Sequence, residues 1–356
     1  MTDTTLEGRL KKAYEPSVIQ RYPYPLAPEN LKHDYIPSRR NQKGDIIPFD
    51  EICSQIALLC TEVEAWYCKK TGKERFDRFN LGEMLQSVQE RIWYDKRFKD
   101  AFQKLGIDWE QHHKKTNLPW WNEIGSGEIS HNSPHAADEE ACSTFVPIHA
   151  LETQVVKGGV NLPVKAASTD GIIRLQGDSA ASEGYIAIGV RGGTGFRNCY
   201  HLCAAGYLRT TPPFKERKQS IYEGFVRDEL CAELGAVKNK ITHSQCIGRI
   251  FDFMINYGGP EFIFEVNLNL TREQLIATWQ ANRDEDKREH LELIFIPDNR
   301  EAIQNFIQEN YRGVVANRST RTEHERLLIH PGALGLALYS SMAPEELRKF
   351  YRPGIW

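Results

Sequence analysis

The sequence lacks a long apolar run and carries little net charge. No apolar segment approaches the ~20 residues that a membrane helix needs, and the first residues are polar and acidic, unlike the apolar core of a signal peptide. Its 45 Lys and Arg nearly balance 48 Asp and Glu, giving a formal net charge of −3. That balance argues against a strongly basic nucleic-acid surface and against an acidic tail. We therefore expect a cytoplasmic protein without membrane contact, and nothing indicates a nucleic-acid partner.

The sequence also lacks a Cys-x-x-Cys pair, internal repeats and low-complexity segments. Eight cysteines in a chain of 356 residues, without such a pair, are typical of reduced thiols in a cytoplasm rather than of a disulfide framework. The length suggests about two domains, each able to bury a core.

The N-terminal third divides into an arm and a helical region. Residues 1–45 are rich in Pro, Tyr and charge, which predicts an extended arm rather than part of a core. Apolar residues then recur at helical spacing through 50–70 and 79–105. Residues 122–142, rich in Gly, Ser, Asn and His, predict a loop. We therefore expect a small helical domain with its linker over 46–148, whose alternative roles are dimerisation, covering the C-terminal site, or specificity.

The most informative segment is 224–236, Gly-Phe-Val-Arg-Asp-Glu-Leu-Cys-Ala-Glu-Leu-Gly-Ala. Glu229 and Glu233 are four residues apart in a predicted helix, so their carboxylates lie on one face. Leu230 and Leu234 repeat that spacing and can face a core, and Gly235 provides a C-terminal stop. Two like charges at this spacing repel, but a bridging divalent cation would reverse that sign because hard cations bind carboxylate oxygens. A solvated helix face is the alternative that the pair alone favours.

Two predicted strands and a loop precede this helix. Tyr185–Arg191 and Tyr200–Ala204 are the strands, and residues 192–195 form the turn between them. A loop with Lys215 and Arg217 leads into the helix. This order of strand, glycine, loop, acidic helix and Leu-Gly resembles the Nudix hydrolase superfamily.

The resemblance includes the Nudix box itself, in a divergent form. Aligned on Gly235, Glu229 and Glu233 match two acidic positions of the box. Ala232 stands where the family has a metal-binding Glu, and Asp228 stands where it has Arg. The upstream Glu of the box falls on Ser220, with Glu216 and Glu223 as possible substitutes. The first glycine, Gly206, lies 29 residues before Gly235, where the box has 21. The loop after Gly206 is therefore eight residues longer than in the box.

The resemblance implies an α+β fold, with a mixed sheet flanked by helices over 149–345 and a C-terminal tail over 346–356. It implies an opening strand pair over 164–176 that turns at Asp170–Gly171. Further strands are expected over 244–255, 261–270 and 291–297, and helices over 301–307 and 331–342.

The resemblance further implies divalent-metal-dependent hydrolysis of a nucleoside diphosphate linked to another group, with Mg²⁺ or Mn²⁺ as cofactor. The alternative is a Nudix-like module that binds a nucleotide or a partner without turnover, which the substitutions at 228 and 232 favour. A homodimer is also expected. The implied metal ligands are Glu229, Glu233 and Glu223; the implied catalytic residues are Glu229, Glu233 and Glu289, the last as general base; and the implied phosphate contacts are Arg191, Lys215 and Arg217.

Two further groups of metal-binding residue types have weaker patterns. One lies in the predicted loop and matches no closed tetrahedral zinc spacing. The other alternates along a predicted strand and would share one face, but it has no evident fourth ligand, and packing is the usual role of a buried Cys. The first group comprises His131, His135, Asp138, Glu139 and Cys142, and the second comprises Cys199, His201 and Cys203.

Overall fold

The computed structural model combines α and β structure, with one large mixed sheet and few helices, as the α+β prediction expects. Glu289, Lys215, Arg217 and the helices predicted over 50–105 lie outside the described residues. The structure describes residues 18–35, 38–40, 46–48, 124–136, 139–149, 165–177, 183–192, 198–208, 221–252, 258–282, 290–312 and 326–350.

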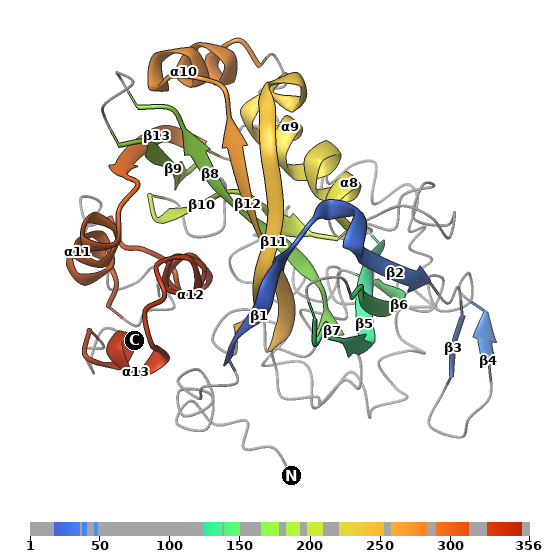
Figure 1. Ribbon diagram of the computed structural model, residues 1–356. Helices are drawn as coiled ribbons and strands as arrows, with labels where there is room; N and C mark the ends of the chain where they lie inside the picture. Colours follow the sequence, from blue (N-terminus) through green and yellow to red (C-terminus); the bar gives the residue numbers. More distant parts are fainter. Residues whose placement is uncertain are drawn as a thin grey trace, which may run out of the picture.

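The centre of the fold is a seven-stranded sheet in the order β1-β11-β12-β8-β10-β9-β13 (Figure 1). β12 and β8 are parallel, and every other pair of neighbours in that order is antiparallel. The strands predicted in the C-terminal half are therefore confirmed. The strands of this sheet are β1 (Ile19–Leu26), which the sequence did not predict, β8 (Ser168–Leu175), β9 (Tyr185–Arg191), β10 (Tyr200–Tyr207), β11 (Ile241–Asp252), β12 (Gly259–Leu268) and β13 (His290–Pro297).

One expectation about β8 is wrong. The chain does not turn at Asp170–Gly171 but runs straight through both residues. Gly171 lies opposite Cys203 of β10, and a methyl group at Gly171 would crowd Ile173, the carbonyl of Cys203 and Phe225. The glycine therefore serves the close approach of neighbouring groups within the sheet rather than a hairpin turn.

Helices cover both faces of this sheet (Figure 1). One face carries a continuous helix made of α8 (Ile221–Phe225), η4 (Val226–Leu230) and α9 (Cys231–Leu234), as predicted for 221–234. The opposite face carries α11 (Arg300–Asn310), α12 (His330–Tyr339) and α13 (Pro344–Arg348), and α10 (Arg272–Gln280) follows β12. α12 is apolar all round and buried over nearly its whole length, which is typical of a helix inside a core.

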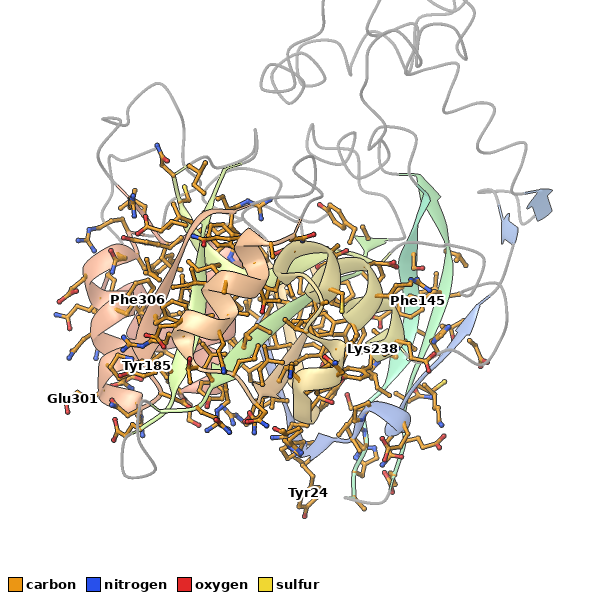
Figure 2. The ribbon with its side chains drawn as sticks, turned by 90° about the horizontal axis from the view of Figure 1, so that it is seen from above. Tyr24, Phe145, Tyr185, Lys238, Glu301 and Phe306 are labelled. Carbon is orange, nitrogen blue, oxygen red and sulfur yellow. The ribbon has the colours of Figure 1, made fainter. Side chains whose placement is uncertain are left out.

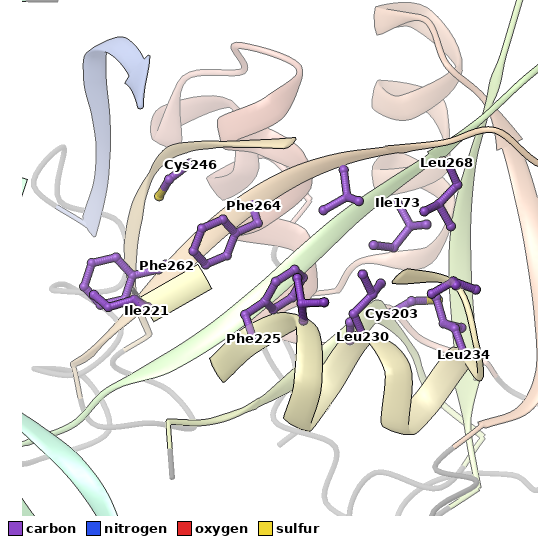
Figure 3. Packing of buried hydrophobic residues seen from close by; sticks show 14 of the residues in the cluster. Ile173, Cys203, Ile221, Phe225, Leu230, Leu234, Cys246, Phe262, Phe264 and Leu268 are labelled. Atoms are coloured by element: carbon purple, nitrogen blue, oxygen red, sulfur yellow. The ribbon is translucent and has the colours of Figure 1, made fainter. Parts of the chain in front are cut away.

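The acidic helix is held on the sheet by its apolar side (Figure 3). Phe225, Leu230 and Leu234 are fully buried in one cluster with Cys203 and Phe264. The rings of Phe225 and Phe264 stack with centroids 4.7 Å apart. Each such side chain contributes roughly 1.5–3 kcal/mol when it leaves water, so the apolar residues fix which side of the helix faces β10.

A smaller sheet pairs the strands in the order β2-β6-β5-β7. The loop predicted over 122–142 is wrong, because residues 124–132 form the paired strand β5 and β6 begins at Ala141. Gly and Ser are weak strand formers, but β5 pairs with β6 on one side and β7 on the other, and this pairing outweighs local propensity. The bounds are β2 (Leu31–Tyr35), β5 (Ile124–Asn132), β6 (Ala141–His149) and β7 (Lys165–Ala166); two short strands, β3 (Ser38–Arg40) and β4 (Ile46–Pro48), pair separately, and single 3-10 turns occupy Pro28–Asn30 and Lys238–Lys240.

The N-terminal arm is likewise part of the core between residues 19 and 35. β1 is an edge strand of the large sheet, and Tyr22, Leu26 and Leu31 are buried in the same cluster as Phe145 of β6. The sequence hid this because Pro and Tyr dominate the segment, while only every third or fourth residue faces the core. Figure 2 shows Tyr24 of the same strand pointing outward, with Phe145 in the small sheet.

Arg249 joins the two sheets and the edge strand. Its guanidinium donates to Glu128 of β5 at 2.8 Å and to Gln20 of β1 at 2.6 and 3.2 Å. Ser143 of β6 donates to the other oxygen of Glu128 at 2.9 Å. Burial raises the pKa of Glu128, and Arg249 opposes that rise. Because Arg249 is itself buried, each charge depends on the other for its stability in the core.

Candidate functional site

The acidic helix contains a π-helical turn at Val226–Leu230, where the N–H of Cys231 donates to the carbonyl of Val226 five residues earlier. Such turns are rare and are found often at functional sites. Glu229 and Glu233 are both buried, whereas Glu223 is exposed. Glu229 and Glu233 thus lie on the inner side of the helix, and Glu223 lies on its outer side.

Glu229 lies against the end of β10. Its side chain is 6% exposed, and its carboxylate is the nearest group to Gly206. A methyl group at Gly206 would come closer than 3.0 Å to that carboxylate, which real Cβ atoms essentially never do. The glycine at this position thus leaves room for the acid. Gly206 and the acidic helix, which the sequence placed in one motif, meet in the fold.

Glu233 lies one helical turn further on and is held by the protein itself. Its Oε2 accepts from the N–H of Ala204 at 2.8 Å, and its Oε1 accepts from the N–H of Ala205 at 3.1 Å. The two amides point the same way because β10 is irregular here: Ala204 has a left-handed backbone with φ of 58°, and the pairing with β8 shifts between Cys203 and Gly206. Successive N–H groups in such a bend form an anion-binding concavity.

His290, the first residue of β13, completes this arrangement. Its Nε2 lies 2.6 Å from Oε2 of Glu233, and both side chains are almost fully buried. Burial works against a charged ring, but the Glu233 carboxylate and the neighbouring Cys203 outweigh it and raise the pKa of His290 to about 10. The ring fits because Gly189 of β9, two residues before the Arg191 that pairs with His290, has no side chain to collide with the imidazole. Sequence reasoning missed His290; the glycine inside an otherwise apolar strand was the available signal.

Arg191 is half-buried at the end of β9, where it pairs with His290 of β13. Its positive charge also acts on His201, whose pKa is held well below the usual value by burial and then by Arg191 and His290. Two positive groups near one neutral histidine leave this end of β9 suited to an anion. The predicted phosphate contact at Arg191 therefore lies on the Glu233 side of the fold, near His290.

The structure describes all three carboxylates that are predicted to bind a metal ion. Within the described ranges, no group of three or more His, Cys, Asp or Glu side chains is arranged to bind a metal ion, and this covers the described members of the His131 and Cys199 groups. Glu223 is exposed, away from the buried pair. Both oxygens of Glu233 already accept hydrogen bonds. Metal binding by the three predicted ligands therefore stays a prediction.

A second buried polar cluster lies on the α12 face. Asp170 of β8 hydrogen-bonds Glu261 of β12, and burial, followed by the charge of Glu233, raises the pKa of Asp170 to about 7, although Glu261 and Arg191 act in the opposite direction. His330, at the start of α12, lies 3.9 Å from Asp252. Asp170 and Glu261 are 2% and 4% exposed, so these two carboxyl side chains contact each other inside the protein, away from solvent.

The chain matches no protein-family model, and no curated protein sequence matches it. No helix in the described part of the chain combines the length and apolar character of a membrane span.

Proposed function

We propose that this protein is a Nudix-like module that binds a nucleoside diphosphate linked to another group, at the end of β10 beside Glu229. The observation that carries the proposal is the contact between the Glu229 carboxylate and Gly206, under a helix laid on the sheet by Phe225, Leu230 and Leu234. Arg191, which pairs with His290 at the end of β9, offers a positive charge for a phosphate, and Lys215 and Arg217 are further candidates from the sequence.

Binding without turnover is the better-supported form of this function. A Nudix-type hydrolase would hold Mg²⁺ or Mn²⁺ with several carboxylates, and here Glu233 is occupied by Ala204, Ala205 and His290. Ala232 supplies no carboxylate where the family has one. The residues present do not fit a complete magnesium site, and we derive no hydrolytic step through a metal.

The second candidate is slow, divalent-metal-dependent hydrolysis of the same class of substrate. One observation favours it: Glu229 and Glu233 both lie on the buried side of the helix, as the spacing of the box requires. In that case Glu229 would be the principal ligand and catalytic residue, and Glu289, which directly precedes His290 in the sequence, would be the general base. A cytoplasmic location and a homodimer formed through residues 46–148 stay predictions.

A single assay separates the two. The full chain is incubated with Mg²⁺ or Mn²⁺ and a panel of ADP-ribose, NAD, nucleoside triphosphates and dinucleoside polyphosphates, and products and melting temperature are measured together. A ligand that binds only the folded state stabilises it by about 2.7 kcal/mol at 100 times its Kd. A raised melting temperature without products supports the binding module, and metal-dependent products support the hydrolase. If no compound binds and none is cleaved, both readings fail.

Two variants give the assay a control. With Mg²⁺ or Mn²⁺ present, Glu229→Gln should abolish the ligand-induced rise in melting temperature, because it removes the carboxylate that would attract a cation bridging to the diphosphate, while keeping the side chain's shape. Glu301→Gln removes the same charge from an exposed position on α11, visible at the edge of the molecule in Figure 2, and should leave the rise unchanged.

A further inference from the structure

The two glutamates of the acidic helix have different surroundings. Glu229 lies beside a glycine that makes room for its carboxylate. Glu233 is enclosed by donors from two other strands: the amides of Ala204 and Ala205 on β10, and the ring of His290 on β13. One helix face thus carries two chemically similar groups with separate structural roles.

We infer that Glu233 is a positioning residue, which with His290 and the amides of Ala204 and Ala205 fixes the acidic helix over β10 and thereby sets where the Glu229 carboxylate lies. This rests on the proposed function only in so far as Glu229 is the ligand-binding carboxylate. The attachment of the helix itself does not depend on any ligand.

The number of hydrogen bonds supports the inference. A carboxylate has about four lone-pair sites, and three bonds to Glu233 use most of them, two at Oε2 and one at Oε1. A metal at Oε2 would displace either the amide of Ala204 or the histidine. The displaced donor would stay buried without an acceptor, which costs more than an ordinary hydrogen bond contributes.

The backbone is also adapted to this carboxylate. Ala204 is one of the few non-glycine residues with positive φ among those described, a conformation that costs an alanine energy unless its surroundings maintain it. Here it turns the amides of Ala204 and Ala205 toward Glu233. On β9, Gly189 leaves space for the His290 ring. Residues of β10 and β13 therefore bind the Glu233 carboxylate, and Gly189 of β9 leaves space for the histidine that binds it. A glutamate on the solvated face of a helix needs no such partners.

The test compares full-chain variants that break the same contact in different ways. Glu233→Gln removes the charge and introduces a donor among donors. His290→Gln removes the ring and keeps the carboxylate, and Gly189→Ala pushes the ring away. Folding stability by urea denaturation and Mn²⁺ binding by electron paramagnetic resonance are measured for each variant, for the double variant at 233 and 290, and for the control Glu229→Gln.

If Glu233 positions the helix, all three variants lower the folding equilibrium constant, by roughly 150-fold to 5,000-fold for a broken buried pair. The double variant is then little worse than either single one, because both remove one interaction. Any Mn²⁺ or nucleotide binding weakens in parallel in all three, and Glu229→Gln removes it with little loss of stability.

Additive losses at 233 and 290 would overturn the inference. So would a Glu233→Gln protein that loses Mn²⁺ while His290→Gln keeps or tightens it, since freeing a metal ligand from its histidine should help the metal. If the wild type binds neither Mn²⁺ nor nucleotide, the proposed function fails, but the stability comparison still decides the role of Glu233. If the variants do not fold, amide hydrogen exchange of the wild type decides it: the amides of Ala204 and Ala205 should be strongly protected, and rapid exchange would refute the inference.

Discussion

Replacing Asp170 with Asn should stabilise the protein at pH 8 and leave it almost unchanged at pH 4. Asp170 is 2% exposed and hydrogen-bonds Glu261, and its Oδ2 has no partner within the part of the chain that the structure describes. Ionising it places a charge in a buried site near Glu233 and Asp252; burial and these two acids raise the pKa of Asp170, whereas Glu261 and Arg191 lower it. The Oδ1 of an Asn can accept from Glu261, as the carboxylate of Asp170 does, but an Asn carries no charge.

The sign of the pH dependence follows from the direction of the shift. The folded protein raises the pKa of Asp170 from 3.8 to about 7, so between these values the folded state holds a proton that the unfolded state has released. Stability therefore falls as pH rises from about 4 to about 7 and is then constant. One pKa unit corresponds to about 1.36 kcal/mol, so the full cost of ionisation is ~4 kcal/mol at most. Relaxation around the charge lowers this, and we expect a gain of roughly 2–4 kcal/mol at pH 8.

Urea denaturation at the two pH values measures this gain directly. Glu301→Gln on the exposed side of α11 serves as the control for loss of a negative charge, and should change stability by less than about 0.5 kcal/mol at either pH. A gain of equal size at pH 4 and pH 8 would mean that Asn improves packing and that ionisation of Asp170 does not matter. A loss at both would mean that the acid makes a contact that Asn cannot reproduce.

Three further outcomes are expected. Gly206→Ala should displace the Glu229 carboxylate and abolish the nucleotide-induced rise in melting temperature, at a cost of only about 1 kcal/mol in stability because the displaced group is the end of a flexible side chain; unchanged binding would remove Glu229 from the site. Arg249→Gln should lower the free energy of unfolding in urea by about 3–5 kcal/mol, since it leaves Glu128 buried without its cation. The control Arg326→Gln breaks the exposed pair with Glu292 and should cost under about 1 kcal/mol. Equal costs would contradict this account of the sheet junction. Because the fold raises the pKa of His290, its protonated form stabilises the fold below pH 6.5, and this contribution is lost as pH rises toward about 10. The stability difference between wild type and Glu233→Gln should therefore shrink over that range. A constant difference would show that the pair is not ionic.

The sequence predicted the C-terminal fold well because its signals there are local and periodic. In β9, β10 and β13, apolar residues point to both faces of the sheet and join the cluster on each face. Leu230 and Leu234 mark the inner side of the acidic helix. None of these features needs knowledge of distant partners.

The errors share the opposite property. β5 reads as a loop because its Gly and Ser residues have low strand propensity, and only pairing with β6 and β7 makes it a strand. Tyr22 and Leu26 join the core because β1 pairs with β11, more than 200 residues later. A pattern within ten residues does not contain such partners, so the smaller sheet and the edge strand could not be read from the sequence.

The same distinction applies to the candidate site. The spacing of Glu229 and Glu233 correctly predicted that both carboxylates share one side of a helix, because that depends on helix geometry alone. What each carboxylate does depends on the donors that meet it. Those donors come from Ala204, Ala205 and His290, on strands far away in the sequence. Two glutamates four apart on a helix that faces a sheet are therefore weak support for a shared metal. The stronger criterion is how many of their oxygens are already occupied once the backbone amides and histidines of the facing strands are counted, and Glu233 fails it.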